Sequence, residues 1–297
     1  MKKYVIQFLM FALVTGIVAC NSKKQEEGAE SDEFDAAQEQ SANVASSVEG
    51  IIYNIPPPAE IPWLLESTGV EFNESLINPH TGVDQYMTTF DVAAMNLGVY
   101  AADLGYLSSY EKTQGALNYL NSMKKLADFI GATTAYDVDM LERFEQNLGS
   151  RDSLNNIINQ GIEDADQLLK DDDRSQIAAL LTIGSFIEGL YISTQLIKHY
   201  PETLLSEEAR FTILTPLISV VFNQRNSLND LLKLANTVTQ EGKIAVITNE
   251  LEELSNIYAS LNIGEKLAEN KGNELLNDET LNKIGDKVAQ IRNGIVE

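Results

Sequence analysis

The pattern of hydrophobic and polar positions is helical over most of the chain. From residue 83 onward, apolar side chains recur every three or four residues, the spacing of one face of a helix. The pattern predicts helices over 59–68, 83–110, 111–130, 138–148, 152–170, 176–200, 207–239, 243–262 and 278–293. An interior proline removes a backbone hydrogen bond, so Pro216 is expected to kink or divide the segment 207–239. No strand pattern competes. We therefore predict an all-α bundle of about eight or nine helices.

The segment 176–200 is strongly apolar, with a single acid, Glu188, near its middle. Small residues recur along one of its faces, and such a face lets a second helix approach closely. They are Ala178, Thr182, Ser185, Gly189 and Ser193, and a similar stripe in 83–110 comprises Ala94, Gly98, Ala102, Gly105 and Ser109. The segment is long enough to cross a membrane, but a central acid would cost about 2.5–3.5 kcal/mol there. We interpret it as a buried helix of the bundle.

Two short strings in the chain resemble each other. Arg151–Ile158 recurs as Arg225–Leu232, and each string follows a long helix that carries a central acid, Asp103 or Glu188. Two explanations stay open: internal duplication of 83–170 as 176–240, or chance similarity between helical compositions. A duplication would make the two glycine-bearing helices a pseudo-twofold central pair.

The first twenty residues have the three parts of an export signal. Lys2 and Lys3 precede an apolar run over 4–18, and Ile17-Val18-Ala19-Cys20 ends it. This ending resembles the lipobox of bacterial lipoproteins. The resemblance implies that diacylglycerol is attached to Cys20 and that the leader is cleaved before it. The alternative is an ordinary secretory leader with an incidental cysteine.

The residues after Cys20 form an acidic segment with few apolar side chains. Such a composition cannot offset the entropy of ordering, so 20–50 is predicted to be a disordered tether between the lipid and the body. The expected organisation is a signal peptide over 1–19, this tether, and one helical domain over 51–297. Asn21 stands where aspartate would favour inner-membrane retention under the enteric-type sorting rule. The resemblance therefore implies the outer membrane.

Charge and composition exclude several kinds of partner. The net charge of −23 repels nucleic acid, and it disfavours direct attraction to anionic lipid, which leaves the acyl group on Cys20 as the contact with the bilayer. A single cysteine excludes an intrachain disulfide, and two histidines exclude a histidine-rich metal site. No catalytic motif, cofactor or metal site is expected.

The body also resembles a family of helical bacterial lipoproteins of uncharacterised activity. The likeness is carried by Asn96–Tyr100 with Asp103-Leu104, and by Ile187–Tyr191 with Gln195-Leu196. It spans roughly residues 55–200. It implies an anchored helical domain in the cell envelope and carries no known activity.

Polar and aromatic side chains gather on facing sides of the two glycine-bearing helices. They are Asn96, Tyr100, Asp103 and Tyr106 on the first helix, and Glu188, Tyr191 and Gln195 on the second. Two close carboxylates could bind a hard cation or act as acid and base. The structural interpretation is stronger: both acids lie inside the bundle and pair with arginines, Arg151 and Arg225 being the first candidates.

Two classes of function follow from these features. The preferred hypothesis is an envelope lipoprotein without enzymatic activity that presents a helical bundle to a partner protein or ligand. The alternative is a small-molecule binder or an enzyme with a carboxylate and tyrosine pocket between the central helices. A pocket reaching solvent beside Asp103 and Glu188 would favour the alternative. A closed, salt-bridged core would favour the scaffold.

Overall fold

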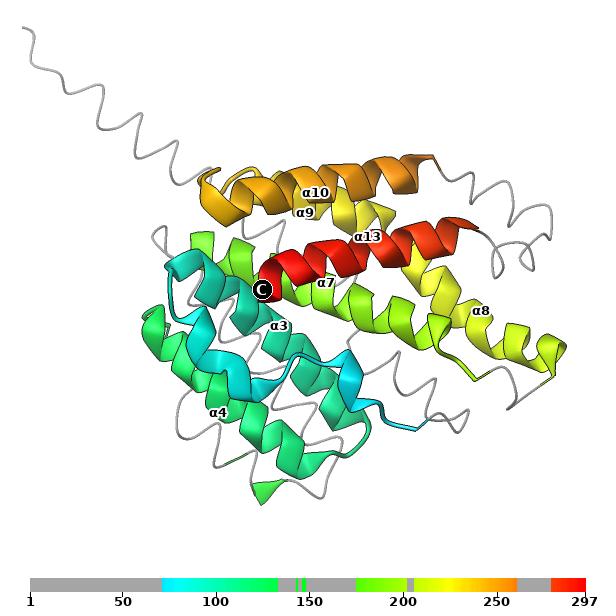
Figure 1. Ribbon diagram of the computed structural model, residues 1–297, viewed down its shortest axis with the longest axis horizontal. Coiled ribbons are helices and arrows are strands. Elements are labelled where there is room, and N and C mark those ends of the chain that lie inside the picture. The colour runs from blue at the N-terminus through cyan, green and yellow to red at the C-terminus, as the bar shows by residue number, and fades with distance from the viewer. Residues whose placement is uncertain (1–70, 133–142, 144–145, 148–174, 202–205, 261–278) are drawn as a thin grey trace, which may run out of the picture. The chain divides into compact units, whose positions relative to one another are not determined.

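The predicted all-α class is confirmed. The computed structural model describes residues 71–132, 143, 146–147, 175–201, 206–260 and 279–297, which all belong to one compact unit, Ala37–Glu297. The described part of the chain contains seven α-helices and two 3₁₀ segments, and no strand (Figure 1). The leader, the tether, the helices predicted over 59–68 and 152–170 and most of that over 138–148 lie outside the described residues.

The elements follow one another in a simple order along the chain. They are η1 (Glu74–Leu76), η2 (His80–Tyr86), α3 (Phe90–Ser109), α4 (Thr113–Phe129), α7 (Ser175–Lys198), α8 (Glu207–Asn223), α9 (Arg225–Ala235), α10 (Gly242–Ala259) and α13 (Glu279–Val296). We call the segment 72–86, which contains η1 and η2, the strap.

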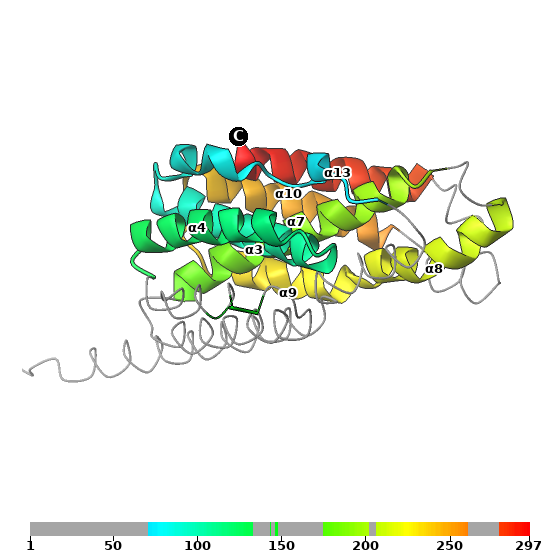
Figure 2. The same ribbon diagram turned by 90° about the horizontal axis from the view of Figure 1, so that it is seen from below.

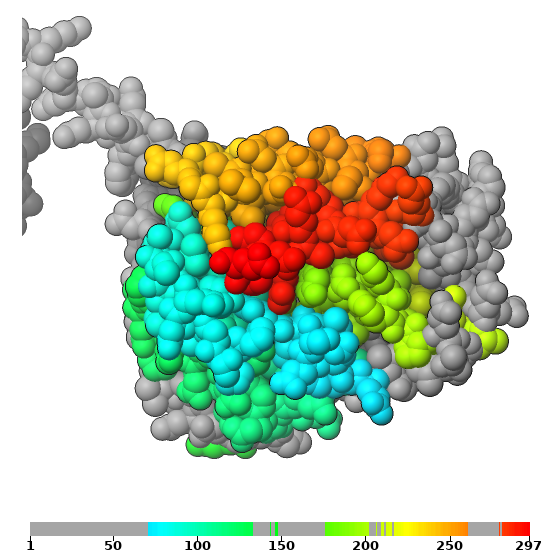
Figure 3. Space-filling view, in the orientation of Figure 1, coloured from blue at the N-terminus to red at the C-terminus, as the bar shows by residue number. Residues whose placement is uncertain are grey.

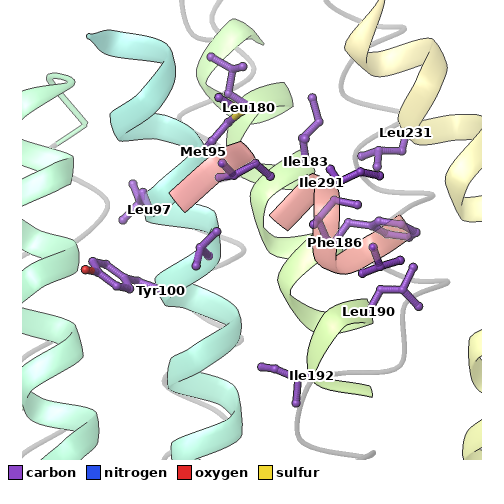
Figure 4. Packing of buried hydrophobic residues seen from close by; sticks show 14 of the residues in the cluster. Met95, Leu97, Tyr100, Leu180, Ile183, Phe186, Leu190, Ile192, Leu231 and Ile291 are labelled. Atoms are coloured by element: carbon purple, nitrogen blue, oxygen red, sulfur yellow. The ribbon is translucent and has the colours of Figure 1, made fainter. Parts of the chain in front are cut away.

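Helices α3 and α7 form the most extensive helix–helix contact in the described part of the chain. They run in the same direction, as Figure 4 shows from the order of the labelled residues along each helix. A Cβ atom at Gly98 would lie 2.0 Å from the carbonyl oxygen of Leu181, and one at Gly184 would lie 1.9 Å from that of Met95. Gly98 thus lies against a carbonyl three residues before Gly184, and Gly184 lies against a carbonyl three residues before Gly98. The crossing is reciprocal, and only glycine fits at its two centres.

The predicted stripe of small residues on 176–200 is only partly the contact surface. Ser185 does lie at the crossing, since its backbone nitrogen would be 2.8 Å from a Cβ atom at Gly98. Gly189 does not, because a Cβ atom there would meet nothing within 4 Å. The close approach is made through Gly184, which lies beside the stripe rather than on it.

The remaining helices pack around this pair. Helix α4 lies against α3, while α13 lies against both α7 and α10, and α10 also contacts α9 (Figures 1 and 2). In the space-filling view α13 fills the space between α10 and the strap (Figure 3). Lys287 of α13 is buried and binds the carboxylates of Glu250 and Glu253, which fixes α13 to α10 by charge as well as by apolar packing.

Two helix boundaries differ from those predicted. Helix α3 begins at Phe90 rather than near residue 83, because the Thr89 hydroxyl caps it by accepting from the Val92 N–H at 3.4 Å. Helix α8 continues through Pro216 and ends at Asn223, and α9 begins directly after Gln224. The segment 207–239 is thus divided into two helices, but the division is not at Pro216. The chain turns at Gln224 instead, where the N–H bonds to the carbonyl three residues back.

Candidate functional site: a buried carboxyl pair under the strap

Glu188 lies at the centre of the bundle with none of its surface exposed. Its two carboxylate oxygens accept hydrogen bonds from Arg292 of α13, from Nε at 3.0 Å and from Nη2 at 3.2 Å. This is the bidentate arrangement in which a guanidinium binds a carboxylate most strongly. The guanidinium also lies over the ring of Tyr191, 4.8 Å from its centroid, so an aromatic face covers the pair.

Asp103 lies beside Glu188 and is equally buried. Its Oδ2 accepts the backbone N–H of Asn78 in the strap at 3.1 Å, while its Oδ1 receives no N–H or O–H donor from the described residues. The neighbouring charge of Glu188 disfavours ionisation of Asp103, because two adjacent carboxylates repel each other. Arg292 stabilises the charged form of Glu188, so Asp103 is the member of the pair whose neutral form is favoured.

Burial governs the titration of both acids. Loss of solvation, then the neighbouring charge of Glu188, raise the pKa of Asp103 well above its ordinary value. Loss of solvation also raises the pKa of Glu188, while Arg292 opposes that rise by charge and by hydrogen bonding. Burial and the charge of Glu188 therefore favour the neutral form of Asp103, while Arg292 favours the charged form of Glu188.

The strap crosses α3 and α4 directly above Asp103. Five hydrogen bonds from these helices reach its main chain. They join the Asn73 N–H to Tyr106 Oη (3.2 Å), the Asn78 N–H to Asp103 Oδ2 (3.1 Å), Tyr119 O–H to the Asn78 carbonyl (2.6 Å), Tyr100 O–H to the Pro79 carbonyl (3.1 Å) and Ser122 O–H to the His80 carbonyl (3.2 Å). Leu76, Ile77 and Asn78 of the strap are buried.

Aromatic rings surround these hydrogen bonds. Tyr100 meets Tyr86 and Tyr119 edge to face, with ring centroids 6.1 and 5.4 Å apart. Tyr106 stacks on Phe72 of the strap at 5.2 Å. Burial raises the pKa of Tyr100, Tyr106 and Tyr119 above the ordinary value, so all three keep their protons at neutral pH.

The last turn of α13 is fixed to the same region. Asn96 of α3 donates to the carbonyl of Ile295 at 3.1 Å, and Tyr86 of the strap donates to that of Val296 at 3.1 Å. These side chains satisfy carbonyls that the end of a helix leaves without intrahelical partners. Arg292 therefore stands on a helix whose end is held by α3 and the strap.

The structure brings together most of the side chains proposed from the sequence. Tyr100, Asp103, Tyr106, Glu188 and Tyr191 lie at the site, and Asn96 lies beside it at the end of α13. Gln195 is buried further along α7. Arg151 lies outside the described residues. Arg225 is exposed at the start of α9, so the arginine that pairs with Glu188 is Arg292 instead.

Sequence reasoning missed Arg292, Asn78 and Tyr119. A signal for Arg292 was present, because it follows Ile291 on a helix whose apolar face includes Ile284, Val288 and Ile295. An arginine at the border of such a face can reach inward, while its apolar stem stays covered. Asn78 and Tyr119 gave no comparable signal, because their contact spans 41 residues of sequence and involves a main-chain atom.

The two carboxyl groups have no exposed surface, and the Arg292 side chain has 13%. No cluster of three or more metal-binding side chains occurs among the described residues. One described helix, over Gln176–Lys198, has the length and composition of a membrane span, but most of it is buried within the bundle. The arrangement of α7 in the structure is that of a core helix.

Comparisons of the chain with protein-family models, with curated proteins and with solved structures find no match. Function must be inferred from the residues themselves.

Proposed function

We propose that the protein is a lipid-anchored protein of the bacterial cell envelope whose helical bundle binds another protein. The anchor is supported by the lipobox-like Ile17-Val18-Ala19-Cys20 and by the acidic tether over 20–50. One acyl chain binds a membrane marginally and two or more bind it stably, so full acylation at Cys20 would hold the domain at the membrane. Asn21 favours the outer membrane as its location.

The observation that carries the binding role over an enzymatic one is the closed state of the Asp103–Glu188 centre. A catalytic carboxylate must reach its substrate within hydrogen-bond distance. Both carboxyl groups have zero exposure, and Arg292 satisfies the one that is charged. Such a centre supports a fixed arrangement of helices rather than chemistry on a substrate.

The anchor is tested by replacing Cys20 with serine. Wild-type cells should incorporate labelled acyl chains into the protein, which should fractionate with the outer membrane. The Cys20→Ser protein should carry no label and should leave the membrane fraction. Equal membrane fractionation of the two proteins, with no acyl label on either, would reject the anchor.

The binding role is tested by chemical cross-linking in intact envelopes, followed by affinity capture and mass spectrometry. The matched control carries residues 1–50 of this chain in front of an unrelated soluble domain, so both proteins share the anchor and tether. We expect at least one envelope protein to be captured only with the helical body. Identical capture by the two proteins would mean that the body has no partner.

A further inference from the structure

We propose that the surface of α3 and α4 covered by the strap, which we call the groove, is a binding site for a peptide segment of a partner protein, and that the strap occupies it in cis. The inference rests on the proposed binding role and names the place where the partner binds. The strap is thus an intramolecular ligand, which the partner's segment displaces.

The first support is the chemistry by which the strap is held. All five hydrogen bonds that α3 and α4 make to 73–80 go to main-chain N–H or carbonyl groups. Main-chain recognition accepts any segment of the same shape, because every peptide except at proline offers the same donor and acceptor. The buried side chain of Asn78 bonds to Tyr86 within the strap itself, and not to the groove.

The second support is that the groove is built without the strap. Helix α3 is held by extensive packing on α7 and on α4, and Thr89, which caps it, lies after the strap. The five groove side chains, Tyr100, Asp103, Tyr106, Tyr119 and Ser122, all stand on these two helices. Removing the strap would therefore uncover a formed site with two acceptors and three hydroxyl donors.

The third support is the way in which the strap is joined to the bundle. Glu71 before it and Thr88 and Thr89 after it are exposed, so these flanking residues do not fix the strap by buried packing. Its one described ion pair with α4, Asp84 with Lys125 at 3.1 Å, lies at the exposed surface and contributes little. The buried contacts that remain are those of Leu76, Ile77, Val83 and Tyr86, the hydrogen bond from Tyr86 to the Val296 carbonyl, and the main-chain hydrogen bonds.

The ligand class follows from the strap that fills the site. The groove fits a segment with two consecutive apolar residues, followed by a small polar residue and a proline, as in Leu76-Ile77-Asn78-Pro79. In the strap this segment leaves a 3₁₀ turn at Leu76 and has no helical structure over 77–79. Proline suits the fourth position because the groove uses the Pro79 carbonyl and makes no bond to a nitrogen there.

A peptide-binding measurement tests this inference. The probe is a fluorescently labelled peptide with the sequence of 71–86. Its control is the same peptide with the Ile77→Ser change. The host is the full chain in detergent, either wild type or with Ile77→Ser, which weakens the strap in cis and leaves the groove intact. We expect the probe to bind the Ile77→Ser chain at least about tenfold more tightly than wild type, because the strap no longer competes effectively.

A second change in the host separates groove binding from non-specific adhesion. Adding Tyr119→Phe removes the donor to the Asn78 carbonyl and should weaken the probe about fivefold, the effect of one hydrogen bond. The proposal would be overturned if the probe bound no more tightly than its Ile77→Ser control. This comparison requires a host chain that keeps its helical circular dichroism.

Hydrogen exchange of the wild-type chain tests strap opening without any substitution. The Asn73 and Asn78 amides should exchange about 100-fold faster than buried amides of α3, because the strap opens while the bundle stays folded. Equal protection of strap and α3 would mean that the strap leaves only on global unfolding, and would overturn the proposal. This result decides the matter if the Ile77→Ser chain does not fold. A partner captured from envelopes, together with a failed peptide test, would reject the groove and keep the proposed function.

Discussion

Arg292 binds both carboxylate oxygens of Glu188, with Nε at 3.0 Å and Nη2 at 3.2 Å, across 104 residues of sequence. The pair joins α13 to α7 at the centre of the bundle. Removing one partner of a buried pair leaves an uncompensated charge in a medium that solvates it poorly. The stability of the fold should therefore depend strongly on these two side chains.

Replacing Glu188 by alanine should lower the free energy of unfolding by about 3–5 kcal/mol. Glu188→Gln should cost less, because an amide oxygen still accepts one hydrogen bond from Arg292. Urea unfolding followed by circular dichroism measures both. The matched control is Arg225→Ala, an exposed position, which should change the free energy of unfolding by less than about 0.5 kcal/mol. An equally small effect of Glu188→Ala would show that the pair does not stabilise the fold.

Asp103→Asn should not lower the free energy of unfolding, whereas Glu188→Gln should lower it. Burial, then the charge of Glu188, raise the pKa of Asp103, so the folded chain keeps a proton that the unfolded chain releases above about pH 4. The free energy of unfolding of the wild type therefore falls as the pH rises from about 4 toward the folded-state pKa. An asparagine is neutral throughout and can both accept from the Asn78 N–H and donate to Glu188.

The difference in free energy of unfolding between the Asp103→Asn chain and wild type should grow with pH. Relative to wild type, the Asp103→Asn chain should gain stability between pH 5 and pH 8, measured by urea unfolding at each pH. Glu188→Gln should be less stable than wild type at both values, because it leaves Arg292 without a charged partner. A constant difference between Asp103→Asn and wild type would place the proton elsewhere.

The glycine crossing offers a test with an internal control. Gly98→Ala and Gly184→Ala would each place a methyl group within 2.0 Å of a carbonyl oxygen of the facing helix. Each should cost about 3 kcal/mol or more, because the helices must separate. Gly189→Ala, on the same helix as Gly184 but facing open space, should instead raise the free energy of unfolding by about 0.5–1 kcal/mol. Thermal melting of the three variants measures the contrast; similar melting temperatures would contradict the close approach.

Lys287→Ala should destabilise the chain by about 2–3 kcal/mol, since it removes charged hydrogen bonds to Glu250 and Glu253 and leaves the partly buried Glu250 with the uncharged donor Gln290 alone. Lys283→Ala is the control. Lys283 lies on the same helix and pairs with Glu279 at 3.1 Å, but both side chains are exposed, so about 0.5 kcal/mol or less is expected. Equal effects in urea unfolding would mean that α13 is not fixed to α10 by charge.

The helical pattern predicted α4, α7, α10 and α13 closely, because each keeps an apolar face over several turns. It failed between residues 83 and 89, where Val83 and Tyr86 are buried at helical spacing but belong to a 3₁₀ segment of the strap. The strap is held by bonds to α3 and α4 rather than by its own periodicity. Local pattern therefore carries little information about it.

The burial of Asp103 and Glu188 could be predicted, because the other faces of their helices are apolar or small. Their partners could not. The repeated Arg-x-Ser-Leu-Asn string pointed to Arg225, whose place at the start of α9 leaves it exposed. The pairing of Glu188 with Arg292 depends on how α13 docks, and no local spacing reports that. The duplication itself stays a prediction, because Arg151–Ile158 lies outside the described residues.

Arg292 lies on α13, near the carboxyl end of the chain, and its position bears on the order in which the core closes. Synthesis runs from the amino end, so α3 and α7 emerge long before the arginine that neutralises Glu188. Until then the α3–α7 crossing can form only with both acids protonated or with its centre open to water. We therefore expect closure of the α3–α7 centre to be coupled to docking of α13, which brings Arg292 to Glu188.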